Sequence, residues 1–269
     1  MPTAGKCVEE DMMNSATDFF FPVLTGCNSG IGYEMAKIAV KDGYKVFALD
    51  IVFGDKLKSL QNDGCNIGQL DVTSPESIAK TKEWIGHEPV DLLFNIAGEP
   101  SKPYTYRNSS HVQPGIMPDP KREDSIETVN LATIQKSFAI NAYGPFLLTQ
   151  ALLPNVLAAK SNPKRIAVIS SRVGSIADNT SGGAYAYRAS KTAVNSLFKT
   201  LAMELKGQGV AVTILHPGFT NTNLSPDLKN IPGVVEPEVA AKGLWKIVKE
   251  KGLEDTGKFW HREGTELPW

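Results

Sequence analysis

Short apolar runs alternate along the chain with longer runs of helical period. The short runs cover residues 19–25, 45–49, 66–70, 90–94, 165–169, 210–215 and 257–260. Between them, apolar residues recur at three- and four-residue spacing, as in the run that begins at Met35 and closes at Gly43. This alternation is typical of repeated strand–helix units, which build a parallel sheet with helices on both faces. The sequence therefore predicts one doubly wound α/β domain over residues 19–269.

Three stretches lack such a period. Residues 1–18 are polar, and we expect them to form a flexible N-terminal arm. Residues 99–124 are polar and contain five prolines, and residues 222–235 separate the strand at 210–215 from the last helical run. Long loops beyond the carboxyl ends of parallel strands often cover a ligand, so we expect both loops on the substrate side.

A glycine-rich turn follows the first predicted strand. Its sequence is Thr25-Gly26-Cys27-Asn28-Ser29-Gly30-Ile31-Gly32, and a helical run begins directly after it. Glycines let the backbone approach a pyrophosphate, and a helix N-terminus offers N–H groups and partial positive charge. The alternative is a tight turn without a ligand. The order strand, turn, helix predicts a Rossmann-type dinucleotide site that uses Gly26, Asn28, Ser29, Gly30, Ile31 and Gly32.

Asp50 ends the second predicted strand, 24 residues after Gly26. A carboxylate at this place can accept both ribose hydroxyls of an adenosine and repel a 2′-phosphate. None of the nearby residues Asn28, Ser29, Ile51 and Val52 is basic. Asp50 therefore favours NAD(H), without excluding NADP(H); the alternative is a solvated aspartate that caps the next turn.

Further polar or small residues follow the other strands. Because the carboxyl ends of parallel strands meet at one edge, we expect them along the same cofactor. The predicted adenine and ribose residues are Asp71, Val72, Asn95, Ala97 and Gly98. The predicted nicotinamide residues are Pro217, Gly218, Thr220 and Thr222. His216, at the end of its strand, is interpreted as a packed residue and not as a catalyst.

Tyr187 and Lys191 lie four residues apart at the start of a run that stays apolar at helical spacing through Leu205. Residues four apart share a helix face, and a fixed ammonium beside a phenol lowers the phenol pKa. Such a phenol can donate a proton to a developing alkoxide. Tyr185 lacks this partner because its i+4 residue is Ala189. The alternative is an ordinary pair on a helix surface.

Two more positions complete a candidate catalytic set. Ser171 follows the strand at 165–169, where its hydroxyl could bond a substrate carbonyl, and Ser175 is a competing candidate. Asn141 lies within an apolar helical run and must find polar partners. It is either a satisfied core residue or the holder of a proton-relay water, by its side chain or by a backbone distortion that Pro145 makes plausible.

Composition narrows the range of partners. A net charge of −1 with a pI near 6.4 gives no field for nucleic acid or anionic lipid, so we expect a small-molecule carbonyl or alcohol substrate. Three widely spaced cysteines suggest neither a disulfide framework nor a metal site. No apolar run approaches a membrane span, and we expect a cytoplasmic protein without a membrane partner.

The motifs together resemble the short-chain dehydrogenase/reductase family over about residues 19–269. The segments 171–178 and 182–187 and the final Leu267-Pro268-Trp269 further resemble the C-factor and sniffer-type carbonyl reductase branch. The resemblance implies a tetrad of Asn141 for a relay water, Ser171 for the carbonyl, Tyr187 as acid/base, and Lys191 for the Tyr187 pKa and the ribose. It also implies that a homodimer or homotetramer is possible.

Three features depart from the family pattern. Ile96 stands where a second asparagine is common, Ser171 precedes Tyr187 by 16 residues where 13 is common, and Pro22 lies in a predicted central strand. The resulting hypothesis is an NAD(P)-dependent oxidoreductase that interconverts a secondary alcohol and a carbonyl. The alternatives are a cofactor-binding signalling or scaffold protein and a reductase of carbon–carbon double bonds.

Overall fold

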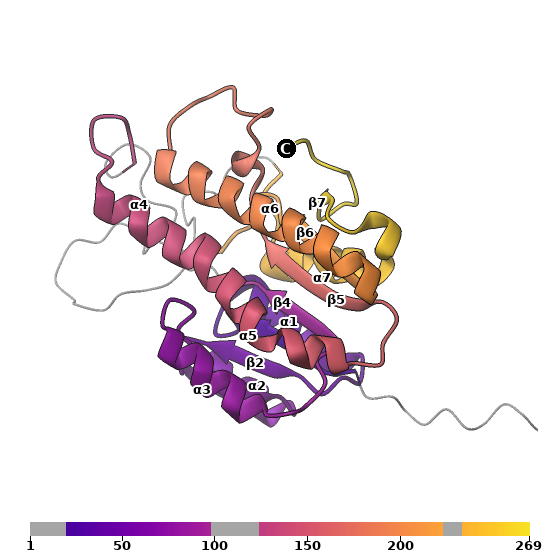
Figure 1. Ribbon diagram of the computed structural model, residues 1–269. Helices are drawn as coiled ribbons and strands as arrows, with labels where there is room; N and C mark the ends of the chain where they lie inside the picture. The colour runs from indigo at the N-terminus through magenta and orange to yellow at the C-terminus, as the bar shows by residue number, and fades with distance from the viewer. Residues whose placement is uncertain (1–19, 98–123, 223–232) are drawn as a thin grey trace, which may run out of the picture.

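The computed structural model describes residues 20–97, 124–222 and 233–269 (Figure 1). The predictions for residues 1–18, for Gly98 and for most of the two substrate-side loops lie outside these ranges. Seven strands, all parallel to their neighbours, form one sheet. Their order is β3 (Asn66–Gln69), β2 (Phe47–Asp50), β1 (Pro22–Thr25), β4 (Leu92–Asn95), β5 (Lys164–Ile169), β6 (Val210–His216) and β7 (Phe259–His261). The predicted doubly wound parallel sheet is therefore confirmed.

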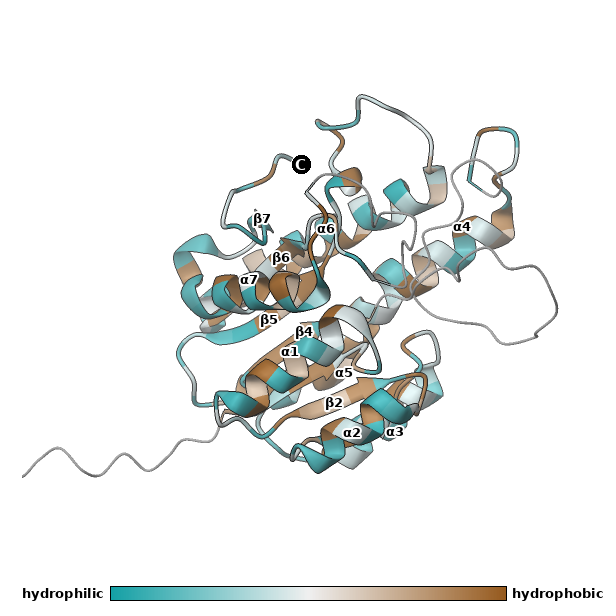
Figure 2. Ribbon diagram, turned by 180° about the vertical axis from the view of Figure 1, so that it is seen from behind, coloured by the Kyte–Doolittle hydropathy of each residue, from teal (hydrophilic) through white to brown (hydrophobic). Residues whose placement is uncertain are grey.

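Helices cover both faces of the sheet (Figures 1 and 2). One face carries α1 (Gly30–Lys41), α2 (Asp55–Asn62) and α7 (Pro237–Glu250). The other carries α3 (Pro75–Ile85), α5 (Gly144–Ala158) and α6 (Tyr185–Leu205), and α4 (Leu131–Phe138) packs against α6. Successive strand residues point to opposite layers: Val23 packs toward α5 and α6, and Leu24 toward α1.

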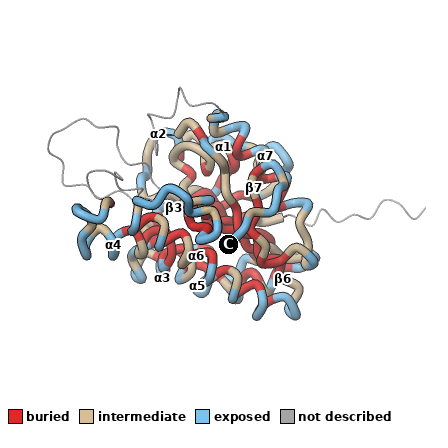
Figure 3. The backbone as a smooth tube through the Cα atoms, turned by 90° about the horizontal axis from the view of Figure 1, so that it is seen from above, coloured by how far each residue is buried: buried red, intermediate tan, exposed pale blue. Residues whose placement is uncertain are grey.

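The strands are apolar on both faces because helices bury both faces. Leu93 and Phe94, adjacent in β4, are both completely buried and belong to the two different layers of the core. Figure 3 shows the buried backbone concentrated in the middle of the molecule, with exposed residues on the outer sides of the helices. No helix within the described ranges is long and apolar enough to cross a bilayer.

Pro22 fits the central strand because it is the first residue of β1. The β1–β2 register begins one residue later, at Val23 opposite Phe47. The preceding amide, of Phe21, bonds instead to the Asp91 carboxylate at 2.9 Å. A proline at the first residue of a strand removes no hydrogen bond that the ladder needs.

Three helical regions show where the local sequence predicted a helix correctly and where it did not. Helix α3 begins as predicted: Pro75 occupies its first position, and the Ser74 hydroxyl accepts from the Ser77 amide at 3.2 Å. Helix α2 was not predicted from the sequence. The predicted long helix around Asn141 is divided by a π-helical turn, Ala139–Tyr143, between α4 and α5.

Candidate functional site

A cavity of about 1050 Å³ opens at the carboxyl ends of β1, β2, β4, β5 and β6. It lies beside the point where the chain, having built β1 to β3, returns to place β4 next to β1. Seventeen predicted site residues line it: Gly26, Asn28, Ser29, Gly30, Ile31, Gly32, Asp50, Val72, Ala97, Asn141, Ser171, Tyr187, Lys191, Pro217, Gly218, Thr220 and Thr222.

The glycine-rich turn is packed too closely for side chains. Gly26 has a φ of +73°, and a Cβ there would lie 3.0 Å from Ala97 Cα. A Cβ on Gly32 would collide with the Gly26 carbonyl oxygen. Gly30 leads into α1, whose first turn holds no acidic residue, and the side chain of its N-cap Ser29 makes no cap hydrogen bond. This turn and helix N-terminus fit the pyrophosphate of a dinucleotide.

Asp50 is locked to the backbone of this turn. Its Oδ2 accepts from the Asn28 amide at 2.8 Å, and its Oδ1 accepts from the Val52 amide at 2.9 Å. Burial raises the pKa of the Asp50 carboxyl, although these amides act to lower it. A carboxylate oxygen has two lone pairs, so each oxygen can accept a further bond from a hydroxyl.

The side chain of Asn28 has a role that the sequence did not indicate. Its Oδ1 accepts from the Leu57 amide at 3.0 Å, in the first turn of α2. The preceding Gly54 has no side chain with which to cap α2, and a Cβ there would lie 2.7 Å from the Asn28 side chain. Asn28 therefore caps α2 and joins this helix to the glycine-rich turn.

Two predicted cofactor residues do not line the cavity. The Asp71 carboxylate accepts from the amide and hydroxyl of Thr73, at 2.8 and 2.7 Å, because it closes the turn before α3. Asn95 is buried, and its amide group donates to the Thr149 hydroxyl at 3.1 Å. The strand-end position was predicted correctly for both, but their side chains serve the fold.

Thr25 supplies the link between neighbouring strands at this edge. Its hydroxyl oxygen accepts from the backbone amides of Ile96 and Ala97, at 3.0 and 2.8 Å. The Ile96 side chain packs in the apolar layer with α1. The departure from asparagine at position 96 therefore leaves β1 and β4 joined at their ends.

Tyr187, Ser171 and Lys191 come together at the cavity wall. Tyr187 and Lys191 are 8% and 6% exposed, and the Lys191 Nζ lies 5.9 Å from the centre of the Tyr187 ring. The same Nζ donates to the Ile169 carbonyl at 3.1 Å. The Tyr187 phenol is hydrogen-bonded to the Ser171 side chain. The four-residue spacing thus places the phenol and the ammonium on one face of α6, and the end of β5 brings Ser171 to the phenol.

Burial dominates the titration of this group. It raises the pKa of the Tyr187 phenol, and the hydrogen bond with Ser171 lowers that pKa by less. It also lowers the pKa of Lys191 to about 8. The expected lowering of the Tyr187 pKa by Lys191 is therefore not found, because burial disfavours the charged form of both groups.

The two candidate serines have different surroundings. Ser171 lines the cavity and contacts Tyr187. Ser175 is 1% exposed, and its hydroxyl oxygen accepts from the Asp178 amide at 3.1 Å, within a turn. This geometry favours Ser171 over Ser175 as the hydroxyl that meets a substrate.

Asn141 lies in the middle of the π-helical turn, four residues before Pro145. Proline has no N–H to donate to the carbonyl four residues earlier, which favours such a local change of helix type. The Asn141 side chain donates to the Ser190 hydroxyl at 3.1 Å, and that hydroxyl donates to the Tyr187 carbonyl at 2.8 Å. Asn141 is thereby tied to the helix that carries Tyr187.

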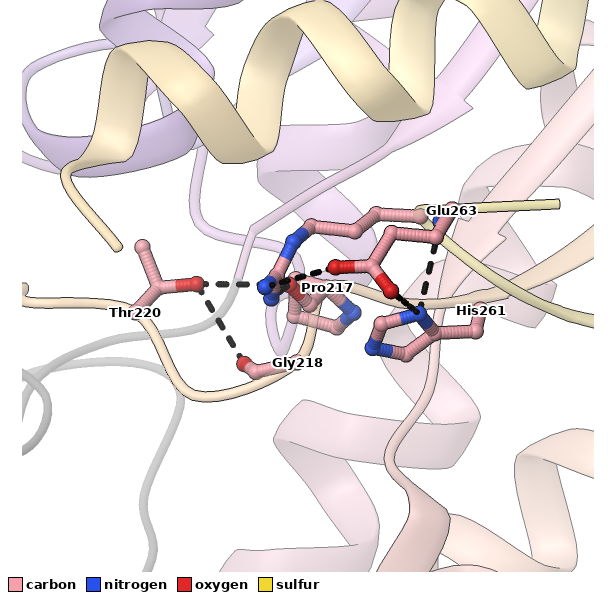
Figure 4. A network of polar contacts seen from close by, with 6 residues as sticks. Pro217, Gly218, Thr220, His261 and Glu263 are labelled. Atoms are coloured by element: carbon pink, nitrogen blue, oxygen red, sulfur yellow. Dashed lines mark hydrogen bonds and ion pairs between the residues drawn. The ribbon is translucent and has the colours of Figure 1, made fainter. Parts of the chain in front are cut away.

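Arg262 shapes the turn after β6 and was not predicted from the sequence. Figure 4 shows the neighbours that meet at this turn, with Pro217 and Gly218 close to His261 and Glu263. Its guanidinium donates to the Pro217 carbonyl at 2.6 Å and to Glu263 at 3.2 Å. Gly218 has a φ of +71°, and a Cβ there would collide with the guanidinium. The Pro217-Gly218 turn therefore depends on a residue that follows β7 and becomes its neighbour only in the folded sheet.

His216 lies at the cavity wall as an uncharged residue. Burial, and the positive groups of His261, Arg262, Arg172 and Lys191, lower the pKa of His216 to about 3. Its ring lies 5.4 Å from that of His261, centre to centre. This agrees with a packed histidine. The described residues contain no group of His, Cys, Asp and Glu side chains that could hold a metal ion.

Comparison with known proteins identifies relatives along most of the chain. A family model described as short chain dehydrogenase matches residues 22–231. A 1-hydroxy-2-glutathionyl-2-methyl-3-butene dehydrogenase from Rhodococcus is 29% identical over 92% of this chain and 98% of that protein. The C-signal protein of Myxococcus xanthus is 36% identical over 52% of this chain and 81% of its own length.

Solved structures show the same fold. An NADPH-bound carbonyl reductase from chicken fatty liver has a TM-score of 0.78 and 26% identity, over 93% of this chain and 99% of that one. The carbonyl reductase Sniffer of D. melanogaster has a TM-score of 0.75 and 24% identity over the same shares. The expected resemblance to C-factor and sniffer-type proteins is therefore confirmed.

Proposed function

The chain belongs to the short-chain dehydrogenase family, and from this premise we propose that it is an NAD(P)-dependent oxidoreductase that interconverts a secondary alcohol and a carbonyl. The observation that carries the proposal is the contact of Tyr187 with Ser171, beside Lys191, in a cavity that the glycine-rich turn also lines. A bound nicotinamide would supply or accept the hydride. The residues of the chain would handle the oxygen and its proton.

Tyr187 is the proposed acid/base. Its raised pKa keeps the phenol protonated at neutral pH, as a donor to a carbonyl oxygen must be. The Ser171 hydroxyl, already in contact with the phenol, would hold the same oxygen. Lys191 would bind the ribose and replenish the Tyr187 proton, with Asn141 holding the relay water. The residues outside the cavity wall, Asp71 and Asn95, have no part in these steps.

Replacement of Tyr187 by phenylalanine tests the reaction. We expect Tyr187→Phe to abolish NADH-dependent reduction across a panel of aldehydes, ketones and diketones, since the ring remains but the proton donor is lost. NADH affinity, measured by fluorescence titration, should stay nearly unchanged. Retained kcat would remove Tyr187 from the role. A wild-type protein that binds NADH but reduces no member of the panel would favour the binding-protein alternative.

We further propose that NAD(H) is preferred over NADP(H). The support is Asp50, which stands at the end of β2 with both oxygens fixed at the cavity wall. A 2′-phosphate there would meet the negative charge of a half-buried carboxylate. NADPH should bind at least about tenfold more weakly than NADH, a difference near 1.4 kcal/mol.

A pair of variants tests whether the preference for NADH comes from contact with Asp50 or from the net negative charge of the cavity wall. Asp50→Ser should narrow the ratio between NADH and NADPH affinities. Asp55→Ser removes another carboxylate of the cavity wall, at the first residue of α2, and should change the ratio little. A wild-type preference for NADPH, as for the cofactor bound in the chicken reductase, would contradict the role of Asp50 and leave the proposed reaction intact.

A further inference from the structure

Helix α6 carries Tyr187 but begins without a cap from its own sequence. Its N-cap residue is Ala184, which has no polar side chain and adopts a left-handed conformation with a φ of +52°. Its first turn contains no acidic residue. The first amides of a helix have no partner within the helix and must be satisfied by some other group. An alanine at this position forms no such bond, and its conformation is unfavourable for a residue with a Cβ.

The missing cap comes from Asp124, which is distant in sequence. Its Oδ1 accepts from the Ala186 amide at 2.7 Å, and its Oδ2 accepts from the Tyr187 amide at 3.1 Å. The Asp124 residue is 0% exposed. Two charge-assisted bonds to the second and third amides form a strong cap, and the carboxylate also meets the positive end of the helix dipole.

This cap acts on the very residue proposed as the acid/base. The Tyr187 amide is held by Asp124, and the Tyr187 carbonyl accepts from the Ser190 hydroxyl. Ser190 in turn holds Asn141 of the π-helical turn. The backbone of Tyr187 is thus fixed on both sides by buried side chains, while its phenol reaches Ser171.

We propose that Asp124 is a positioning residue for the reaction: it holds the first turn of α6 so that the Tyr187 phenol meets Ser171 and the substrate oxygen. The proposal rests on the proposed role of Tyr187. Asp124 also ends the polar stretch that the sequence places on the substrate side, so the same carboxylate joins the end of that stretch to the reacting group. The geometry calls for no contact between Asp124 and the substrate.

Three variants test this role. Asp124→Ala removes the cap. Asp124→Asn keeps one acceptor oxygen but places an NH2 group, which can only donate, against the other of the two helix amides. Ser74→Ala is the matched control, because it removes the cap of α3, a helix whose described residues do not line the cavity. Hydrogen exchange of peptides covering residues 184–190 reports on the cap itself. Turnover is measured on the panel member that the wild-type protein reduces fastest.

We expect Asp124→Ala to speed exchange in residues 184–190 and to lower kcat on the order of 10- to 100-fold, because small misplacements of a reacting group have effects of this size. NADH affinity should change less than about threefold, since the glycine-rich turn and Asp50 are untouched. Asp124→Asn should recover only part of the kcat that Asp124→Ala loses, because it keeps one of the two cap bonds. Ser74→Ala should lower thermal stability without lowering kcat.

The outcomes distinguish this inference from the proposed function. If Tyr187→Phe is inactive while Asp124→Ala keeps wild-type kcat, the positioning role is wrong and the acid/base role stands. Unchanged exchange at residues 184–190 would show that Asp124 does not cap α6. If Asp124→Ala and Ser74→Ala lose kcat equally, the loss comes from a general decrease in stability and the positioning role is wrong. An active Tyr187→Phe would overturn both proposals.

Discussion

At the scale of single residues, burial keeps Tyr187 and Lys191 toward their uncharged forms. The raised pKa of Tyr187 holds the proton that a carbonyl oxygen needs, and the pKa of Lys191, about 8, makes this ammonium readier to release one. In free solution the two groups have nearly the same pKa, about 10 for the phenol and 10.5 for the ammonium, and burial moves the two values apart. Lys191 is therefore the stronger acid of the two, and transfer of its proton to a Tyr187 phenolate is favourable.

The lowered pKa of Lys191 predicts a pH dependence of stability. In the unfolded chain the pKa returns to about 10.5, so between pH 8 and 10.5 the folded state binds fewer protons than the unfolded state. The free energy of unfolding should then rise with pH. Lys191→Met has no titrating ammonium at this position. Between pH 8 and 10.5, the free energy of unfolding of the wild-type protein should rise by up to about 3 kcal/mol more than that of Lys191→Met.

Urea unfolding of both proteins at pH 7, 8, 9 and 10 measures this effect. Below pH 8 both states carry the Lys191 proton, so the difference between the two proteins should stay flat. If the difference in free energy of unfolding between the two proteins also stays flat above pH 8, the pKa of Lys191 is not lowered in the folded protein.

The sequence predicted positions in this site better than side-chain directions. Asp50 and Asp71 both follow strands, yet Asp50 is held at the cavity wall by the Asn28 and Val52 amides while Asp71 closes a turn with Thr73. The difference depends on which amides the folded chain brings near each carboxylate. Asp124 gave no signal, because its partner at Tyr187 is 63 residues away.

At the scale of elements, the π-helical turn is the departure from regular structure that most concerns the site. It turns Asn141 toward α6, where the Ser190 hydroxyl accepts its hydrogen bond and passes one to Tyr187. The sequence left two interpretations of Asn141 open: a satisfied core residue, or the holder of a relay water by its side chain or by a backbone distortion. The structure contains the distortion and gives the side chain a partner in Ser190, and the relay water stays a prediction.

Removal of the Ser190 hydroxyl should weaken the protein measurably. Ser190 is completely buried and takes part in two hydrogen bonds, so we expect Ser190→Ala to lower the free energy of unfolding by about 1–2 kcal/mol. Ser196, exposed on the same helix, is the matched control, and Ser196→Ala should change stability by less than about 0.5 kcal/mol. Equal effects in urea unfolding would contradict the link between α6 and the π-helical turn.

Apolar runs located every strand of the described sheet, with ends displaced by at most three residues from those observed. Helix α2 escaped prediction because it is short and buries Leu57 and Leu60 as its contribution to the core. Its N-terminus is defined by Asn28, on a different element. The residues next to this helix therefore contain no capping signal from which its start could be predicted.

At the scale of the whole molecule, the cavity joins two halves of the sheet. Gly26 and Asp50 come from the half built by β1 to β3, and Tyr187 and Gly218 from the half built around β5 and β6. A ligand that contacts both halves stabilises the folded state by mass action. The sequence predicted both halves of this site, but the order of the strands in the sheet had to be observed.

A thermal unfolding measurement checks whether a dinucleotide bridges the halves. At a concentration 100 times its Kd, NADH should add about 2.7 kcal/mol to the free energy of unfolding, or roughly 5–10 °C in Tm for a domain of this size. Nicotinamide mononucleotide at equal concentration lacks the adenosine half and should add much less. Equal shifts with both compounds would place the whole binding energy in one half of the cavity.

The central strands also set the order in which the protein can be assembled. β1 and β4 are hydrogen-bonded neighbours, although Pro22 and its partner Leu92 are separated by 70 residues of chain. During synthesis, β1 can pair with β2 early but must leave its other edge open until β4 has left the ribosome. Long-range parallel pairing of this kind folds slowly and exposes strand edges meanwhile. The edge of β1 that lies beside the cavity in the folded protein is therefore one that nascent chains must protect until β4 is available.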